Sequence, residues 1–253
     1  MPGLKMKRIA LISMCDGIPT PGLRALEELA GAHGRLVGTY DIRIGEPLPD
    51  LDDFDLLLSS GGPGDPRELG NWGQAYIDLI ERIRLHNENN SASPKHVFLV
   101  CHSFQMISQA WGLGALSRRD EALWGIHPQK AETLPGDAYP VFPTTDFYTL
   151  ESRFYQVMPV HDLNKACEFR DIVIAAHDEK GALTAWQTRD GHIAATQFHP
   201  EALAETIAGI LDNPPSDPKE TINAADRKIR DLTRERLPLI APAYQALVNF
   251  LQR

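Results

Sequence analysis

The stretch that decides the fold of this chain is residues 95–105, KHVFLVCHSFQ. Its first part, Lys95–Val100, is predominantly apolar, which predicts a short buried strand. Ser103–Trp111 follows with the pattern of a helix. A strand that passes at once into a helix is typical of a βαβ unit, in which helices cover a parallel sheet. Cys101 stands at the junction.

The alternation of strand and helix extends through the first half of the chain. Four short apolar segments predict strands: Arg8–Ser13, Leu36–Ile44, Phe54–Ser60 and His96–Val100. Apolar stripes at helical spacing lie between them, in Leu23–Ala30 and Ala75–Leu85. We therefore expect an α/β fold of flavodoxin-like character, with three layers, a mostly parallel central sheet, helices on both faces and an antiparallel extension.

The second half of the chain predicts that extension. Its strand-like segments are Trp124–Thr133, Ser152–Val160, Asp171–His177, Ala182–Thr188 and His192–Gln197. Their connections are short, and Asp190-Gly191 is a tight-turn dipeptide between the last two. Short connections favour antiparallel neighbours.

Two helical patterns end the chain, at Lys219–Arg236 and Ala243–Leu251, after a proline-rich stretch at 213–218. Ile222, Ala225, Ile229 and Leu232 form the apolar stripe of the first pattern. We expect residues 1–212 to form the main domain and residues 213–253 a helical extension packed on it. The alternative is a docking face for a partner or a second copy.

The composition argues against several functional classes for this protein. The 253 residues carry a formal net charge of −9, from 34 acidic and 25 basic residues, and no Lys/Arg cluster favours nucleic acid or an anionic membrane as a partner. Three cysteines without a CxxC pair predict neither a disulfide framework nor a structural zinc site. The apolar run Ile9–Met14 is too short for a signal peptide or a membrane span. We expect a reduced, cytoplasmic protein without a metal or organic cofactor.

Cys101 is the first candidate for chemistry. A thiol between a strand and a helix lies at a sharp turn near a helix N-terminus, where the helix dipole and free N–H groups favour the reactive thiolate. This is the arrangement of a nucleophile elbow. The alternative is an inert core cysteine, because free cysteine is among the most buried residue types.

Two further motifs favour a catalytic cysteine over an inert core cysteine at position 101. Gly61-Gly62-Pro63-Gly64 follows a predicted strand, and such glycines let a backbone N–H approach a substrate and stabilise an oxyanion, although similar clusters are often plain turns. His199-Pro200-Glu201 follows the last strand. Its imidazole and carboxylate point to the same side of an extended segment, so that Glu201 can orient His199. The same string also suits a helix start, and both interpretations can hold.

Gln105 lies four residues after Cys101, on nearly the same face of the predicted helix. It is either a substrate contact or a structural glutamine.

Together these motifs resemble the class I (triad) glutamine amidotransferase family, with its Gly-Gly-Pro segment, G-x-C-x-G-x-Q elbow and terminal His-Pro-Glu. The resemblance covers residues 7–212. Residues 60–66 are similar to the carbamoyl-phosphate synthetase small subunit, and the whole chain resembles stand-alone GMP-synthase-like proteins. The resemblance implies a triad of Cys101, His199 and Glu201. It also implies an oxyanion hole from the N–H groups of Gly62 and His102, and substrate contacts from Gly61, Gly64 and Gln105. Tyr155 and Gln156 are further candidates for substrate contacts.

The chain departs from the family at three places. Leu99 and Ser103 replace the elbow glycines, and we expect Leu99 to require a local rearrangement. The Ser-His-Gly that holds the substrate's backbone groups is absent from residues 153–162, where Tyr155, Gln156 or His161 would have to replace it.

The predicted function is an amide hydrolase that releases ammonia from glutamine through a glutamyl thioester on Cys101. A hydrolase of other γ-glutamyl compounds with the same triad, or a catalytically weak binding protein on this fold, are the alternatives. No P-loop pattern occurs, so an acceptor synthase would be another chain, or the protein acts alone.

Overall fold

The structure is a computed structural model that describes residues 6–212 and 227–253. Its strands are β1 (Arg8–Ser13), β2 (Arg35–Asp41), β3 (Leu56–Ser59), β4 (His96–Val100), β5 (Gly114–Ala131), β6 (Phe147–Pro159), β7 (Ile172–His177), β8 (Leu183–Thr188) and β9 (Ile193–Thr196). Its α-helices are α1 (Pro21–His33), α2 (Gly73–Asn89), α3 (His102–Ala110), α4 (Leu163–Arg170), α5 (Ala204–Asp212), α6 (Arg227–Arg236) and α7 (Ala241–Leu251). Short 3-10 helices span Ile42–Ile44, Leu51–Asp53 and Leu237–Leu239.

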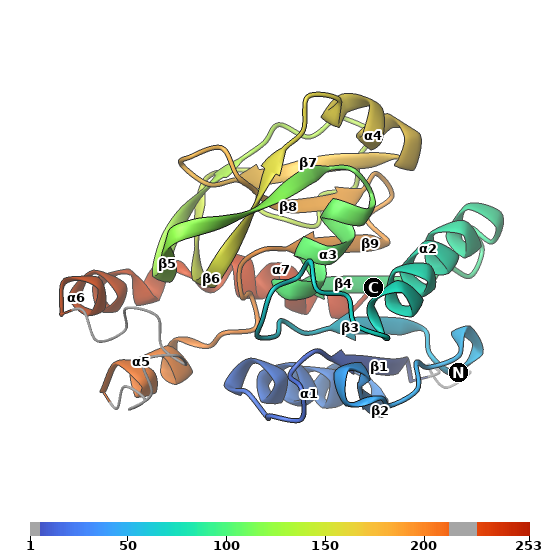
Figure 1. Cartoon of the computed structure of the whole chain (residues 1–253), viewed down its shortest axis with the longest axis horizontal. Helices are drawn as coiled ribbons and strands as arrows, with labels where there is room; N and C mark the ends of the chain where they lie inside the picture. Colours follow the sequence, from blue (N-terminus) through green and yellow to red (C-terminus); the bar gives the residue numbers. More distant parts are fainter. Residues whose placement is uncertain (1–5, 213–226) are drawn as a thin grey trace, which may run out of the picture.

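The described strands form one nine-stranded sheet in the order β2-β1-β3-β4-β9-β8-β6-β5-β7. Strands β2, β1, β3, β4 and β9 run parallel, and Figure 1 shows them below the longer antiparallel strands. The parallel strands predicted at Arg8–Ser13 and His96–Val100 have the predicted bounds. Both are apolar runs that the sheet buries on two faces.

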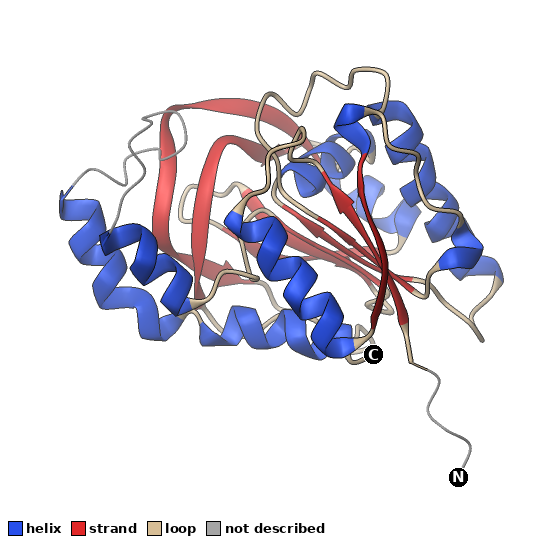
Figure 2. Cartoon of the chain, turned by 90° about the horizontal axis from the view of Figure 1, so that it is seen from below, coloured by secondary structure: helices blue, strands red, loops and turns tan. Residues whose placement is uncertain are grey.

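Helices cover both faces of the parallel strands (Figure 2). Ile9 and Leu11 of β1 pack with α1 and α7 in one core cluster. Ala10 and Ile12 of the same strand pack with α2 and α3 in the other. The pleat of a strand sends alternate side chains to opposite faces, so each parallel strand supplies both clusters. The α/β class is confirmed, with helices on both faces of the parallel strands.

Parallel pairing does not dominate the sheet, which corrects the expectation of a mostly parallel, flavodoxin-like sheet. Of the strand pairs described, four are parallel and five antiparallel. Strand β7 pairs with both β5 and β8, so β5, β6, β8 and β7 close on themselves. The reason is the length of β5 and β6, 18 and 13 residues. Long strands twist, and the register shift between Arg118 and Leu123 lets β5 bend.

The C-terminal helices are described from Arg227 onward. Residues 219–226 of the predicted first helix, with Ile222 and Ala225, lie outside the described residues. Ile229 of α6 packs on a third cluster beside β5, whereas Leu232 is exposed. Leu247, Phe250 and their neighbours in α7 belong to the α1 cluster. No helix in the described ranges is long and apolar enough to cross a membrane.

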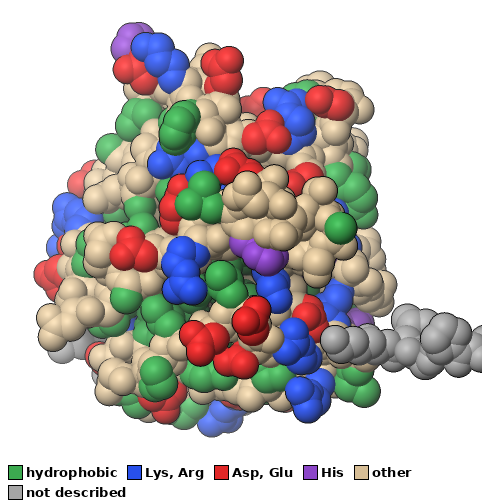
Figure 3. Space-filling model, turned by 90° about the vertical axis from the view of Figure 1, so that its right-hand side faces the viewer, with side chains coloured by type: hydrophobic (Ala, Val, Ile, Leu, Met, Phe, Trp, Pro, Cys, Tyr) green, Lys and Arg blue, Asp and Glu red, His purple; other side chains and the backbone are tan. Residues whose placement is uncertain are grey.

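Charged side chains of both signs alternate on the face drawn in Figure 3, with no single basic patch.

Candidate active site

Cys101 sits at the strained turn between β4 and α3. Its φ of 52° and ψ of −98° lie in a region that residues other than glycine rarely adopt, at a cost of about 1–3 kcal/mol. The Cys101 N–H donates to the carbonyl of Thr196 over 2.7 Å, which fixes the turn to the end of β9. The backbone is that of a nucleophile elbow, with the thiol at the start of a helix.

Ser103 takes the place of an elbow glycine, and its hydroxyl stabilises the turn by hydrogen bonds. Its hydroxyl accepts the Val100 N–H at 2.8 Å and lies 2.9 Å from the Val100 carbonyl and 3.2 Å from that of Ser59. Leu99 is fully buried in β4, and its pairing with Ser59 and Ala195 shows no register shift. The expected rearrangement at Leu99 is therefore wrong, because this position is an ordinary strand residue whose side chain fills the α2–α3 core.

His199 and Glu201 follow β9 and contact each other directly. The distance from His199 Nδ1 to Glu201 Oε1 is 2.8 Å, and Glu201 is only 1% exposed. The carboxylate also abuts the first turn of α1, where a Cβ on Gly22 would lie 2.9 Å from Oε1. The positive end of the helix dipole favours an anion there.

Electrostatics favour the charged form of His199. Burial alone lowers the pKa of His199, but the charge of Glu201 and the hydrogen bond with Cys101 outweigh burial and hold it well above its usual value. An imidazolium beside a thiol stabilises the thiolate.

The side chains of Cys101 and His199 converge on the backbone of Gly61. A Cβ on Gly61 would lie 3.1 Å from both Cys101 Cβ and His199 Cε1, and 3.8 Å from the sulfur. A Cβ on Gly62 would lie 2.1 Å from the Met14 carbonyl oxygen, so only glycine fits. Gly61 therefore keeps the space between thiol and imidazole open, and Gly62 lets the loop pass close to Met14.

Arg43 holds this glycine loop in place. Its Nη1 donates to the carbonyl of Pro63 at 2.5 Å and to that of Met14 at 3.3 Å, and it packs beside Gly64, whose φ is +91°. The His102 side chain is buried at the start of α3, where burial and then the charge of Arg43 lower its pKa to about 4. No sequence motif pointed to Arg43.

The predicted substrate side chains are already engaged by the protein. Gln105 is 3% exposed, and its Nε2 donates to the Tyr155 carbonyl at 3.2 Å and to Gln197 Oε1 at 3.0 Å. The Tyr155 hydroxyl donates to Asp65 at 2.9 Å. Gln156 accepts from Arg119 at 2.6 Å.

Strand β6 contacts the thiol through Ser152, the residue just before the stretch 153–162 in which the family's Ser-His-Gly was expected. The Cys101 sulfur lies 3.9 Å from the Ser152 carbonyl oxygen. Buried Arg153 pairs with Glu151 (Nε–Oε2, 3.0 Å) and with Asp178 (Nη2–Oδ2, 2.9 Å). His161 is exposed in the turn after the far end of β6, about 30 Å of extended chain from Ser152, so it does not join the site.

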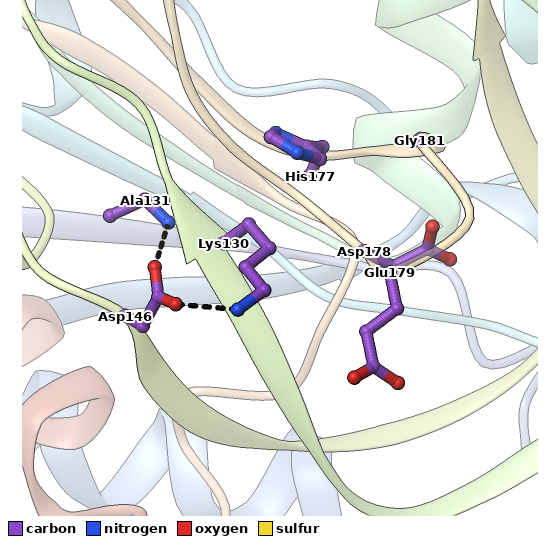
Figure 4. Close-up of a pocket in the computed structure, with 7 residues that line it drawn as sticks. All are labelled: Lys130, Ala131, Asp146, His177, Asp178, Glu179 and Gly181. Carbon is purple, nitrogen blue, oxygen red and sulfur yellow. Dashed lines mark hydrogen bonds and ion pairs between the residues drawn. The ribbon is translucent and has the colours of Figure 1, made fainter.

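A separate cavity of about 660 Å³ lies between the ends of β5 and β7 (Figure 4). It is lined by Lys130, Ala131, Asp146, His177, Asp178, Glu179 and Gly181. None of these is a predicted site residue, and Lys130 is paired with Asp146 at 2.7 Å. The described residues contain no group of three or more His, Cys, Asp and Glu side chains that could hold a metal ion.

Comparisons with known proteins give one family match and several similar structures. Residues 36–213, well over half of the chain, match the family model for glutamine amidotransferase class-I. No curated protein sequence matches the chain.

Several solved structures are similar. A glutamine amidotransferase from Methylobacillus flagellatus is 18% identical with a TM-score of 0.66, over 98% of this chain and 96% of that one. One from Thermotoga maritima is 16% identical with a TM-score of 0.63, over 98% and 99%. A protein from Thermoplasma acidophilum, provisionally described as a GMP synthase subunit, is 19% identical with a TM-score of 0.52, over 96% and 98%. At these identities the likeness shows the fold.

Proposed function

Because this chain belongs to the class I glutamine amidotransferase family, we propose that it is a cysteine-dependent amide hydrolase that releases ammonia from glutamine. The observation that carries the proposal is the strained backbone of Cys101 beside the His199–Glu201 pair. Strain of this kind persists where the surrounding structure holds it for a functional purpose, which favours an enzyme over a catalytically weak binding protein.

The proposed reaction begins when the Cys101 thiolate attacks the side-chain carbonyl carbon of glutamine. The N–H groups of Gly62 and His102 stabilise the tetrahedral oxyanion. His199 donates a proton to the departing ammonia, which leaves a glutamyl thioester on Cys101. His199 then takes a proton from water, whose oxygen displaces the sulfur and yields glutamate. Glu201 orients His199 through Nδ1.

The substrate would lie along the backbone of Gly61 and Gly64. The side chains of Gln105, Tyr155 and Gln156 would surround it. The last three are hydrogen-bonded within the protein, so they offer little to the charged α-groups of glutamine. Unpaired buried charges are costly. We expect weak binding of glutamine, with a KM above about 1 mM.

The second candidate is a hydrolase of other γ-glutamyl compounds with the same triad. The pairing of Arg153 with Glu151 and Asp178 favours it, because the charged side chains beside Ser152 are not free to pair with a glutamine α-carboxylate or α-ammonium group. Another γ-glutamyl compound carries the same two charges, but the group attached to its γ-carbonyl adds contacts that can offset their desolvation cost.

Residues 1–212 are the proposed amidotransferase domain, and residues 213–253 a helical extension of it, which the packing of α7 against α1 supports. The ammonia would pass to a separate synthase chain or be released, and one similar structure carries the name of a synthase subunit. Free cysteines at all three positions suit a reduced, cytoplasmic setting.

Ammonia release, measured over glutamine and a panel of γ-glutamyl amides, tests the proposal. The wild-type chain should release ammonia from at least one compound, and Cys101→Ala should release none. Cys167→Ala is the matched control, because Cys167 lies on α4 away from the site and should keep the wild-type rate. Activity that survives Cys101→Ala would overturn the assignment of the nucleophile.

A further inference from the structure

Gln197 lies two residues before His199, and its side chain faces the nucleophile. It is fully buried. Its Nε2 is 3.6 Å from the Cys101 sulfur, a normal distance for an N–H···S hydrogen bond, and its Oε1 is 3.0 Å from Gln105 Nε2. A buried amide in contact with the reacting atom has a role in the chemistry of that atom or in holding it.

The orientation of the two amides follows from one backbone carbonyl. Gln105 lies 3.2 Å from the oxygen of Tyr155, and a carbonyl oxygen can only accept, so the Gln105 NH₂ must face Tyr155. The same NH₂ group faces Gln197, so Gln197 must present its oxygen to it. The NH₂ of Gln197 is therefore the end that faces the sulfur.

Besides His199, the sulfur has two polar neighbours of opposite kind. The Ser152 carbonyl at 3.9 Å can accept a hydrogen bond from the thiol but offers nothing to the thiolate. The Gln197 NH₂ can donate to the sulfur, and hydrogen bonds to an ionised acceptor are roughly twice as strong as those to a neutral one. The contact is buried from water, so no solvent donor competes with it.

We propose that Gln197 is a further catalytic residue, whose side-chain amide donates a hydrogen bond to the Cys101 thiolate. Gln105 is the positioning residue that fixes this amide, rather than a substrate contact. The inference rests on the proposed function, in which Cys101 is the nucleophile. The donor stabilises the thiolate before attack and again when water expels it from the thioester.

The test is the rate of Cys101 alkylation by iodoacetamide as a function of pH, followed at the Cys101 peptide by mass spectrometry. In Gln197→Leu the thiolate loses its donor, and the midpoint of the pH–rate profile should rise by about one pH unit, which is about a tenfold loss of thiolate below the midpoint. Gln197→Glu, which keeps the shape but places a carboxylate near the sulfur, should raise the midpoint further. Gln105→Leu should raise it less.

Gln187→Leu is the matched control. Gln187 is also fully buried, but its amide binds the backbone of Tyr139 and Val141. This variant should lose stability while its alkylation midpoint stays at the wild-type value.

The results distinguish a failure of the role proposed for Gln197 from a failure of the proposed function. Unchanged midpoints in Gln197→Leu and Gln197→Glu, with Cys101 still essential for ammonia release, would overturn the role of Gln197 alone. Should Gln197→Leu fail to fold, Gln197→Glu and Gln105→Leu decide the question by the same profile. Ammonia release that survives Cys101→Ala would instead overturn the proposed function.

Discussion

Gly22 leaves room for the carboxylate that orients His199. A Cβ at this position would lie 2.9 Å from Glu201 Oε1, closer than carbon and oxygen atoms normally approach. Gly22→Ala should displace Glu201 and lower kcat by about tenfold to a hundredfold, because small misplacements of catalytic groups are costly. Steady-state ammonia release measures the effect.

Gly31→Ala is the control for this prediction, since it lies in the same helix with nothing within 4 Å of the added Cβ. It should keep full activity and gain about 0.5–1 kcal/mol of stability. Equal activities in the two variants would show that Glu201 does not depend on Gly22.

The charge state of His199 gives a pH prediction. Although burial lowers the pKa of His199, Glu201 and Cys101 together raise it well above its usual value. The contribution of His199 to stability is therefore complete below about pH 6.5 and is lost as the pH rises through the folded-state pKa. NMR titration of the imidazole should show a protonated ring above neutral pH in the wild type and a lower pKa in Glu201→Gln. A wild-type pKa near 6.5, unchanged by this substitution, would contradict the pairing.

Residues in local motifs were predictable, and residues from distant segments were not. Cys101, His199 and Glu201 stand in short strings that could be singled out from the sequence, and the structure places Cys101 and His199 beside Gly61, with Glu201 in contact with His199. Gly22, Arg43 and the Gln197–Gln105 contact had no such signal. The Gln197–Gln105 contact joins residues that are 92 positions apart in the sequence, and only the folded chain shows that they touch.

The β4–α3 elbow depends on the hydroxyl of Ser103, an interaction at the scale of an element. Ser103→Ala removes the acceptor of the buried Val100 N–H and should lower the free energy of unfolding by about 1–3 kcal/mol, the cost of an unsatisfied buried donor. Urea denaturation measures it. Ser91→Ala, at an exposed serine, should stay within about 0.5 kcal/mol of the wild type; a loss as large as that of Ser103→Ala would contradict the stabilising role of the Ser103 hydroxyl.

The elements themselves were predictable where their apolar pattern was strong. The buried strands β1 and β4 have the predicted bounds, and α1 and α2 extend their predicted stripes by a few residues. Helix α4 was missed because it buries none of its residues and so carries no apolar stripe. The first ten residues of β5, Gly114–Leu123, were missed because only Gly114 among them is buried, so they carry no apolar pattern.

At the scale of the whole molecule, α7 ties the end of the chain to the first core cluster. Phe250 is 1% exposed and packs edge-on against Phe98 of β4, with ring centroids 5.2 Å apart. Phe250→Ala should lower the free energy of unfolding by about 3–5 kcal/mol, as measured by urea denaturation. Gln245→Ala on the exposed side of α7 should change it by less than about 0.5 kcal/mol. Equal, small effects would favour the alternative that α7 is a docking face.

The sheet topology was predictable only for its parallel half. Helices between strands imply parallel neighbours, and that inference holds for β1 to β4. Short connections predicted antiparallel pairing in the second half, but not the closure of β7 onto both β5 and β8. Closure depends on the twist of long strands, which the sequence pattern does not encode.

The central claim is that Cys101 carries the acyl group during turnover. The most direct measurement is acid quenching of the wild-type chain during turnover of its best γ-glutamyl substrate, followed by peptide mass spectrometry. The account predicts a glutamyl adduct on the peptide that contains Cys101 and none on those with Cys15 or Cys167. Ammonia release that proceeds without an adduct on Cys101, or with one on another cysteine, would contradict it.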